Sequence, residues 1–161
     1  MFGELSMRLY LVQHADAMLK EEDPSRPLSS KGWKEIRNMA KYAQKHLQIQ
    51  VALIIHSGKL RARQTAEVLA EHLHPAKGML VSKDLEPLAD PMIWKKRLAE
   101  TAEDVMLVGH LPHLQKLTDR LLTGDENRKV ATFNNAGIVC LNKESGYWTI
   151  QWIMTPEMLP G

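Results

Sequence analysis

Residues 9–14 read Leu-Tyr-Leu-Val-Gln-His, an apolar run that ends on a polar pair. A nearly continuous apolar stretch of this length is typical of a central β-strand covered on both faces. His14 comes where that strand would end. Because open α/β sheets bind their ligands at the carboxyl ends of the strands, the position of His14 predicts a functional site at that edge.

Two later segments repeat this arrangement. Residues 51–56 and 104–109 are again mostly apolar, and each is followed by cationic or imidazole side chains and then by a helical pattern. Arg61 follows the first of them and His110 follows the second. If the three strands are parallel, their carboxyl ends meet at one edge of the sheet, and we expect His14, Arg61 and His110 to meet there.

Hydrophobic periodicity predicts that strands and helices alternate along most of the chain. Strands are expected over residues 8–13, 51–56, 79–82 and 104–109, and helices over 31–47, 60–73, 91–101 and from Pro112 onward. Residues 137–141 and 147–153 are predicted as a hairpin joined through 143–146. The fold class is therefore α/β: a three-layer α/β/α sandwich with a mostly parallel central sheet and an antiparallel edge from the C-terminal hairpin.

Bulk properties narrow the class of protein. A length of 161 residues predicts a single domain over 1–161, with residues 1–6 as a loose N-terminal extension. No apolar run approaches the roughly 20 residues of a membrane span, and the start lacks signal-peptide features, so a cytoplasmic protein without a membrane partner is expected. A net charge of +2, with both signs interleaved, argues against nucleic acid as a partner.

The side chains expected at the sheet edge suit an anion better than a metal ion. Two histidines beside an arginine, without paired carboxylates, make a poor metal site because the guanidinium repels a cation; neither metal nor cofactor is expected. A phosphate matches the planar fork of donors on Arg61. Gln13, Arg26 and Ser57 are predicted to contribute to substrate binding, Ser57 through its N–H near a helix start.

A neutral imidazole is itself a capable nucleophile for phosphorus. If a backbone carbonyl holds the Nδ1–H of His14, its Nε2 is left free to attack. Phosphoryl transfer then depends mainly on positioning and on neutralising charge on the equatorial oxygens. Arg61 and His110 are the groups expected to supply that charge.

The chain resembles the histidine phosphatase (phosphoglycerate mutase-like) superfamily, and within it the small SixA-type phosphohistidine phosphatases. Four motifs carry the resemblance, in order and at similar spacings. The strand-Arg-His-Gly motif matches 13–15, and the Arg-Pro-Leu-Thr-x-x-Gly stretch matches 26–32. The Ser-x-x-x-Arg-Ala-x-Gln-Thr-Ala motif matches 57–66, and the Gly/Ser-His-x-Pro motif matches 109–112. The resemblance covers nearly the whole chain.

This resemblance implies roles for three residues. It implies that His14 is the nucleophile that becomes phosphorylated, and that Arg61 and His110 clamp the phosphate. Water then hydrolyses the phosphohistidine, without a metal ion. The implied substrate is phosphohistidine on a partner protein, such as a phosphotransfer domain of a signalling relay.

Two residues depart from the pattern. Gln13 stands where the family usually has arginine, and Ala15 replaces glycine. Gln13 still donates hydrogen bonds but carries no charge, and losing a charged phosphate contact would cost about 1.5–3 kcal/mol without compensation. Ala15 matters only if its backbone needs a positive φ.

The general acid is the least defined part of the predicted site. Glu86 is a candidate, and so is Asp16. A phosphohistidine needs little help from an acid because its N–P bond is labile.

The alternatives that stay open are a small phosphate ester as substrate, a mutase, and a weakly active phosphate-binding module in which Gln13 has reduced turnover.

The remaining basic and imidazole side chains are expected to be surface or loop residues without a catalytic role. They are His46, His56, Arg63, His72, His74 and His113.

Overall fold

The computed structural model describes residues 6–160 of the chain. The extension predicted over 1–6 therefore falls outside the described residues, except for Ser6. Ser6 is the first residue of strand β1 (Ser6–Gln13), where it pairs with Glu144, so the extension does not include it.

Six strands form one mixed sheet in the order β3-β2-β4-β1-β5-β6. After β1, the strands are β2 (Leu53–His56), β3 (Met79–Val81), β4 (Val105–Gly109), β5 (Ile138–Glu144) and β6 (Tyr147–Met154). Strands β3, β2, β4 and β1 are mutually parallel, and β5 and β6 continue the sheet antiparallel to them. The predicted α/β sheet with an antiparallel hairpin edge is confirmed.

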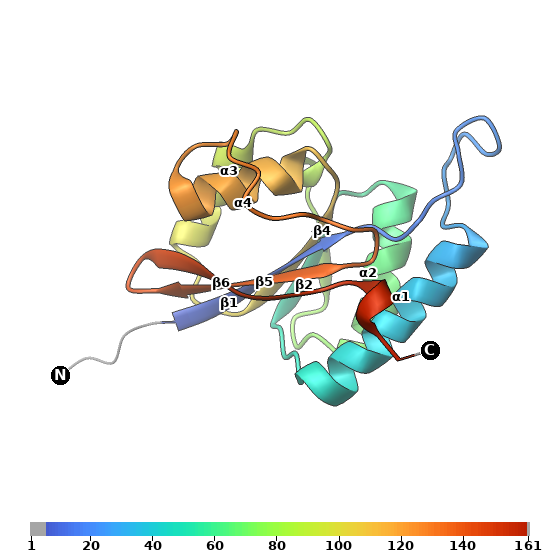
Figure 1. The fold of residues 1–161 in the computed structure, drawn as a ribbon, viewed down its shortest axis with the longest axis horizontal. Coiled ribbons are helices and arrows are strands. Elements are labelled where there is room, and N and C mark those ends of the chain that lie inside the picture. The colour runs from blue at the N-terminus through green and yellow to red at the C-terminus, as the bar shows by residue number, and fades with distance from the viewer. Residues whose placement is uncertain (1–5, 161) are drawn as a thin grey trace.

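Four α-helices cover the two faces of the sheet (Figure 1). They are α1 (Ser30–Tyr42), α2 (Leu60–Leu73), α3 (Pro91–Ala99) and α4 (His113–Thr123). Helices α1 and α2 pack on one face, and α3 and α4 on the other. Among residues 6–160, no helix is long and apolar enough to cross a membrane.

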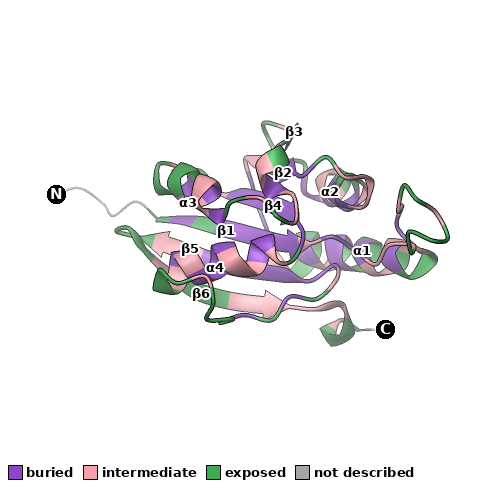
Figure 2. Cartoon of the chain, turned by 90° about the horizontal axis from the view of Figure 1, so that it is seen from above, coloured by how far each residue is buried: buried purple, intermediate pink, exposed green. Residues whose placement is uncertain are grey.

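Strand β1 is central and buried on both faces, as its apolar sequence predicts (Figure 2). Its side chains alternate between two cores, as the pleat of a strand requires. Tyr10 and Val12 join the core under α1 and α2, and Leu9 and Leu11 join the core under α3 and α4. A strand with a helical layer on each face therefore has apolar residues at consecutive positions.

The boundaries differ from the prediction by one or two residues at several ends, and by more than two in two places. The helix expected over 31–47 is α-helical only to Tyr42 and continues as a π-helical turn, Ala43–Leu47. The hairpin turn is shorter than 143–146, because Ser145 and Gly146 both adopt positive φ, as a tight two-residue turn requires. Lys143 and Glu144 remain in β5, where the Lys143 ammonium donates to the Leu98 carbonyl near the end of α3.

Candidate active site

The carboxyl ends of three parallel strands bring the predicted side chains together. His14 follows β1, Arg61 lies in the first turn of α2 after β2, and His110 follows β4. The His14 backbone N–H donates to the Gly109 carbonyl at 3.0 Å, which ties the ends of β1 and β4 together. The rings of His14 and His110 lie 5.1 Å apart, centroid to centroid, with their planes tilted by 52°.

The backbone fixes which nitrogen of His14 carries the hydrogen. Nδ1 lies 2.7 Å from the Ala15 carbonyl oxygen. Because a carbonyl can only accept, Nδ1 is the protonated nitrogen and Nε2 keeps its lone pair. Burial lowers the pKa of His14 from 6.5 to about 4, so the ring is neutral at pH 7. His14 is therefore a neutral imidazole with its free nitrogen on the side away from Ala15.

Two guanidinium groups supply the positive charge near these rings. The charge of Arg61 acts on both His14 and His110, and the charge of Arg26 acts on His14 and Arg61. The Arg26 Nε donates to the Met18 carbonyl at 3.0 Å, which anchors its side chain. The Arg61 Nε is buried without a hydrogen-bond partner among residues 6–160. Such a pair of cations suits an oxyanion.

His110 is held by Ser57. The Ser57 Oγ and the His110 Nε2 lie 2.6 Å apart, and both residues are buried. Burial, together with the His14 ring and the Arg61 charge, lowers the pKa of His110 to about 3. With its pKa lowered this far, the His110 ring is neutral at pH 7 and acts as a hydrogen-bonding group toward Ser57.

The loops around the site are held by hydrogen bonds to Gln64 and Thr65, two residues of the 57–66 motif for which the sequence predicts no role. The Thr65 hydroxyl accepts from the Ala15 N–H at 2.9 Å and donates to the Arg61 carbonyl at 2.7 Å, joining the loop after His14 to α2. The Gln64 Oε1 accepts from the Leu28 N–H at 2.8 Å, which fixes the segment that carries Arg26.

The glycine of the 26–32 motif is explained by a close backbone approach. A Cβ on Gly32 would lie 2.0 Å from the Asp16 carbonyl oxygen. Ser29 caps α1 at the same point, accepting from the Gly32 N–H at 3.0 Å and donating to the Asp16 carboxylate at 2.5 Å. The start of α1 therefore packs directly on the loop that follows His14. Ala15, by contrast, is not among the residues with positive φ, so its side chain is tolerated.

Asn135 is a site residue that the sequence analysis missed. The Gln13 Nε2 donates to the Asn135 Oδ1 at 2.9 Å. No local motif marks it, because only the antiparallel pairing of β5 with β1, which begins opposite Val12, brings the residues just before β5 to the carboxyl edge of β1.

The two candidate acids occupy different positions. The Asp16 carboxylate is bound by Ser29 and is among the charges that act on His14. Glu86 is half-buried on the loop after β3, next to Leu85, whose carbonyl packs against Gly109. A depression of about 500 Å³ lies between this loop and Lys59, whose charge acts on His110.

Two histidines expected at the surface are buried. His56 is 4% exposed, and its Nδ1 accepts from the Gly58 N–H at 3.1 Å, which stabilises the turn after β2. His113 is fully buried in the first turn of α4, and neither ring nitrogen has a partner among residues 6–160. The expectation of surface or loop positions was wrong for these two residues. His56 is the last residue of β2, within the sheet, and His113 lies in the first turn of α4, on its buried side.

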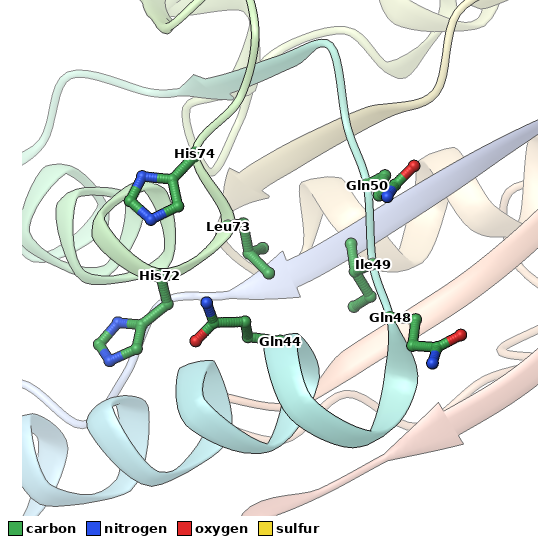
Figure 3. A pocket seen from close by; sticks show the side chains of 7 residues that line it. All are labelled: Gln44, Gln48, Ile49, Gln50, His72, Leu73 and His74. Carbon is green, nitrogen blue, oxygen red and sulfur yellow. The ribbon is translucent and has the colours of Figure 1, made fainter.

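A cavity of about 610 Å³ lies far from these residues (Figure 3). It is lined by Gln44, Gln48, Ile49, Gln50, His72, Leu73 and His74. Because α2 begins at the carboxyl edge of β2 and ends at Leu73, this cavity lies at the opposite end of α2 from Arg61.

Within residues 6–160, no group of three or more His, Cys, Asp or Glu side chains is placed to hold a metal ion.

The sequence is similar to those of known proteins over most of its length. No protein-family model matches the chain. The chain is 29% identical over 155 residues to the phosphohistidine phosphatase SixA of Escherichia coli K12, covering 93% of this chain and 94% of that protein. It is 34% identical over 146 residues to an uncharacterised protein of Picosynechococcus, covering 84% of each.

The fold also matches solved structures of phosphatases, SixA among them. A structure of the protein histidine phosphatase SixA complexed with tungstate matches with a TM-score of 0.84 and 28% identity, covering 96% of this chain and all of that one. The α-ribazole phosphatase of Shigella flexneri shares the fold at 13% identity, with a TM-score of 0.76. With this likeness over nearly its full length, the chain belongs to the histidine phosphatase (phosphoglycerate mutase-like) superfamily and is of the SixA type.

Proposed function

We propose that this protein is a phosphatase that removes the phosphoryl group from phosphohistidine on a partner protein, through a covalent intermediate on His14. The observation that carries the proposal is the state of His14. Its Nδ1–H is engaged by the Ala15 carbonyl at 2.7 Å, its ring is neutral at pH 7, and Arg61 lies beside it. These are the properties that a nucleophile toward phosphorus needs.

In the first step, the Nε2 lone pair of His14 attacks phosphorus. The bond between phosphorus and the substrate nitrogen breaks, its electron pair returns to that nitrogen, and the nitrogen takes up a proton from water. The phosphorylated His14 ring then carries a positive charge, which the hydrogen bond to the Ala15 carbonyl stabilises. Arg61 and Arg26 neutralise charge on the phosphoryl oxygens.

In the second step, water attacks the phosphorus on His14. The P–Nε2 bond breaks, its electron pair returns to Nε2, one proton of the water leaves to solvent or to a carboxylate, and inorganic phosphate departs. His14 is then neutral again, with Nδ1 protonated. Residues of this chain suffice for both steps, so the proposed reaction needs no metal ion.

Three observations support phosphohistidine over an alkyl phosphate as substrate. A relative that is 29% identical over nearly the whole chain is a phosphohistidine phosphatase. No carboxylate of the described residues is bonded to His14 or His110, which suits a leaving imidazole that needs little acid. A depression lined by Lys59, Glu86 and the 88% exposed Leu88 lies next to the turn after β2, and it offers a partner protein a surface to contact.

The test compares two substrates and two proteins. Wild type and His14→Ala are incubated with a protein carrying phosphohistidine and, in parallel, with an aryl phosphate. We expect wild type to hydrolyse phosphohistidine preferentially, a ³²P-labelled intermediate to be trapped on it, and His14→Ala to be inactive and unlabelled.

Other outcomes separate the alternatives. Turnover of the aryl phosphate alone would indicate a small-molecule phosphatase. If wild type turns over neither substrate yet binds phosphate, the chain is a binding module, and the proposed activity is rejected.

A further inference from the structure

Gln13 and Asn135 form an amide pair beside the nucleophile. Gln13 is the residue before His14, and its Nε2 donates to the Asn135 Oδ1 at 2.9 Å across 122 positions of sequence. The SixA-type pattern has a charged arginine where Gln13 stands. The structure therefore places a neutral side chain, and a partner for it, directly before His14.

The segment that carries Asn135 is docked rigidly on the catalytic strand. The Ala136 N–H donates to the Gln13 carbonyl at 3.0 Å, and the Gly137 N–H donates to the Asn134 carbonyl at 2.8 Å, closing a turn. Ala136 adopts a positive φ of 61° and is fully buried. Asn135 is thus held next to Gln13 by the backbone hydrogen bonds of its neighbours as well as by its own side chain.

An amide side chain has two polar ends, and Asn135 occupies one of them. The other end of Gln13, its Oε1, is buried without a hydrogen-bond partner among residues 6–160. Exchanging the oxygen and nitrogen of both amides keeps the pair and still leaves one end of Gln13 without a partner. A buried polar group without a partner is costly, so this end is suited to a ligand.

We propose that Asn135 is a positioning residue, which holds Gln13 so that the second end of its amide contacts the phosphoryl group; this inference rests on the proposed function. The Gln13–Asn135 pair thus takes the place of the arginine side chain that the SixA-type pattern has at position 13. As an NH₂ group the free end donates to a phosphoryl oxygen, and as a carbonyl it accepts from a protonated one. An arginine offers only the first contact, because it has no acceptor.

The proposal predicts how Asn135 contributes to binding. Without Asn135, the Gln13 amide is free to turn away, so binding of the oxyanion weakens although every other contact remains. Since Asn135 acts only through Gln13, its removal has no further effect once Gln13 is gone. A residue that merely supports the loop would weaken binding in either background.

The experiment is a double-mutant cycle read by binding of inorganic phosphate, measured by isothermal titration calorimetry at pH 7. The proteins are wild type, Asn135→Ala, Gln13→Ala and the double variant, with Asn134→Ala as the matched control at a neighbouring exposed position. We expect Asn135→Ala and Gln13→Ala each to raise the Kd for phosphate by about two- to tenfold, the range for one neutral hydrogen bond. The double variant is expected to match Gln13→Ala, and Asn134→Ala to match wild type.

Two results would overturn the inference in distinguishable ways. If Asn135→Ala weakens binding equally with and without Gln13, or leaves it unchanged, Asn135 does not act through Gln13, while the proposed function stands. If wild type neither binds phosphate nor hydrolyses phosphohistidine, both the proposed function and this inference are rejected.

Discussion

The Ser57 hydroxyl and the His110 Nε2 lie 2.6 Å apart, which joins the turn after β2 to the end of β4. Both residues are buried, and the other ring nitrogen of His110 has no partner among residues 6–160. The Ser57 Oγ also accepts from the Lys59 N–H at 3.3 Å, so one hydroxyl organises the turn and orients the ring.

Ser57→Ala is expected to lower the free energy of unfolding by about 1–3 kcal/mol, because it leaves a buried imidazole nitrogen unsatisfied. Urea unfolding followed by circular dichroism measures the change. Ser25→Ala, which removes an exposed hydroxyl bonded to Asp23, is the control and should stay within about 0.5 kcal/mol of wild type. Equal effects of the two variants would mean that the Ser57–His110 contact contributes nothing.

Gly32→Ala should destabilise the protein by about 1–3 kcal/mol or more, because its Cβ would lie 2.0 Å from the Asp16 carbonyl. Moving that carbonyl also moves the loop after His14, so turnover should fall as well. Thermal unfolding and phosphohistidine hydrolysis test both effects. Lys31→Ala, at the neighbouring exposed position of α1, should change neither; a stable and active Gly32→Ala would contradict this account.

His113→Leu is expected to stabilise the protein increasingly as the pH falls. Burial lowers the pKa of His113 from 6.5 to about 4. Between these values the unfolded chain binds a proton that the folded protein does not, so wild-type stability declines as pH drops through this window. The Asp84 and Asp90 charges oppose the shift without cancelling it.

The advantage of His113→Leu over wild type should therefore grow by up to about 3 kcal/mol between pH 7 and pH 4. Urea unfolding at several pH values measures it. A difference that stays constant with pH would show that His113 does not remain neutral in the folded protein over this range.

The general acid is tested by Glu86→Gln and Asp16→Asn on two leaving groups. If Glu86 donates the proton, Glu86→Gln lowers turnover of an alkyl phosphate by about a hundredfold or more, because an alkoxide leaving group needs the proton. Turnover of phosphohistidine should fall far less. The same pattern in Asp16→Asn, with Glu86→Gln unaffected, would move the role to Asp16.

Metal dependence gives a fifth prediction. We expect phosphohistidine hydrolysis to be unchanged after dialysis against EDTA and after addition of Mg²⁺ or Zn²⁺, since the proposed steps use only His14 and the two arginines. Loss of activity on dialysis with recovery on adding a metal ion would contradict the mechanism.

Much of this architecture could be predicted from the sequence because the decisive patterns are local. The apolar run before His14 identified a central strand, and the apolar segments before Arg61 and His110 identified its parallel neighbours. The carboxyl-edge rule then brought three distant residues together. The hairpin that ends the sheet was visible as two strand-like runs around a glycine.

What could not be predicted depends on contacts between elements. Asn135 stands in a polar loop, and only the pairing of β5 with β1 brings it to Gln13. His113 occupies an ordinary helical position, and its burial follows from how the start of α4 packs in the fold. Likewise, the neutral state of His110 is a result of burial, which no motif encodes.

The strand order has a consequence for how the protein is made. Of the six strands β1 is synthesised first, yet its two neighbours in the sheet are β4 and β5, which lie about 100 and about 130 residues further along the chain. A growing chain on the ribosome therefore carries His14 early, on a strand whose edges stay unpaired until most of the polypeptide has emerged. The edge that brings His14, Arg61 and His110 together is thus completed late in synthesis, when β4 and β5 close the sheet around β1.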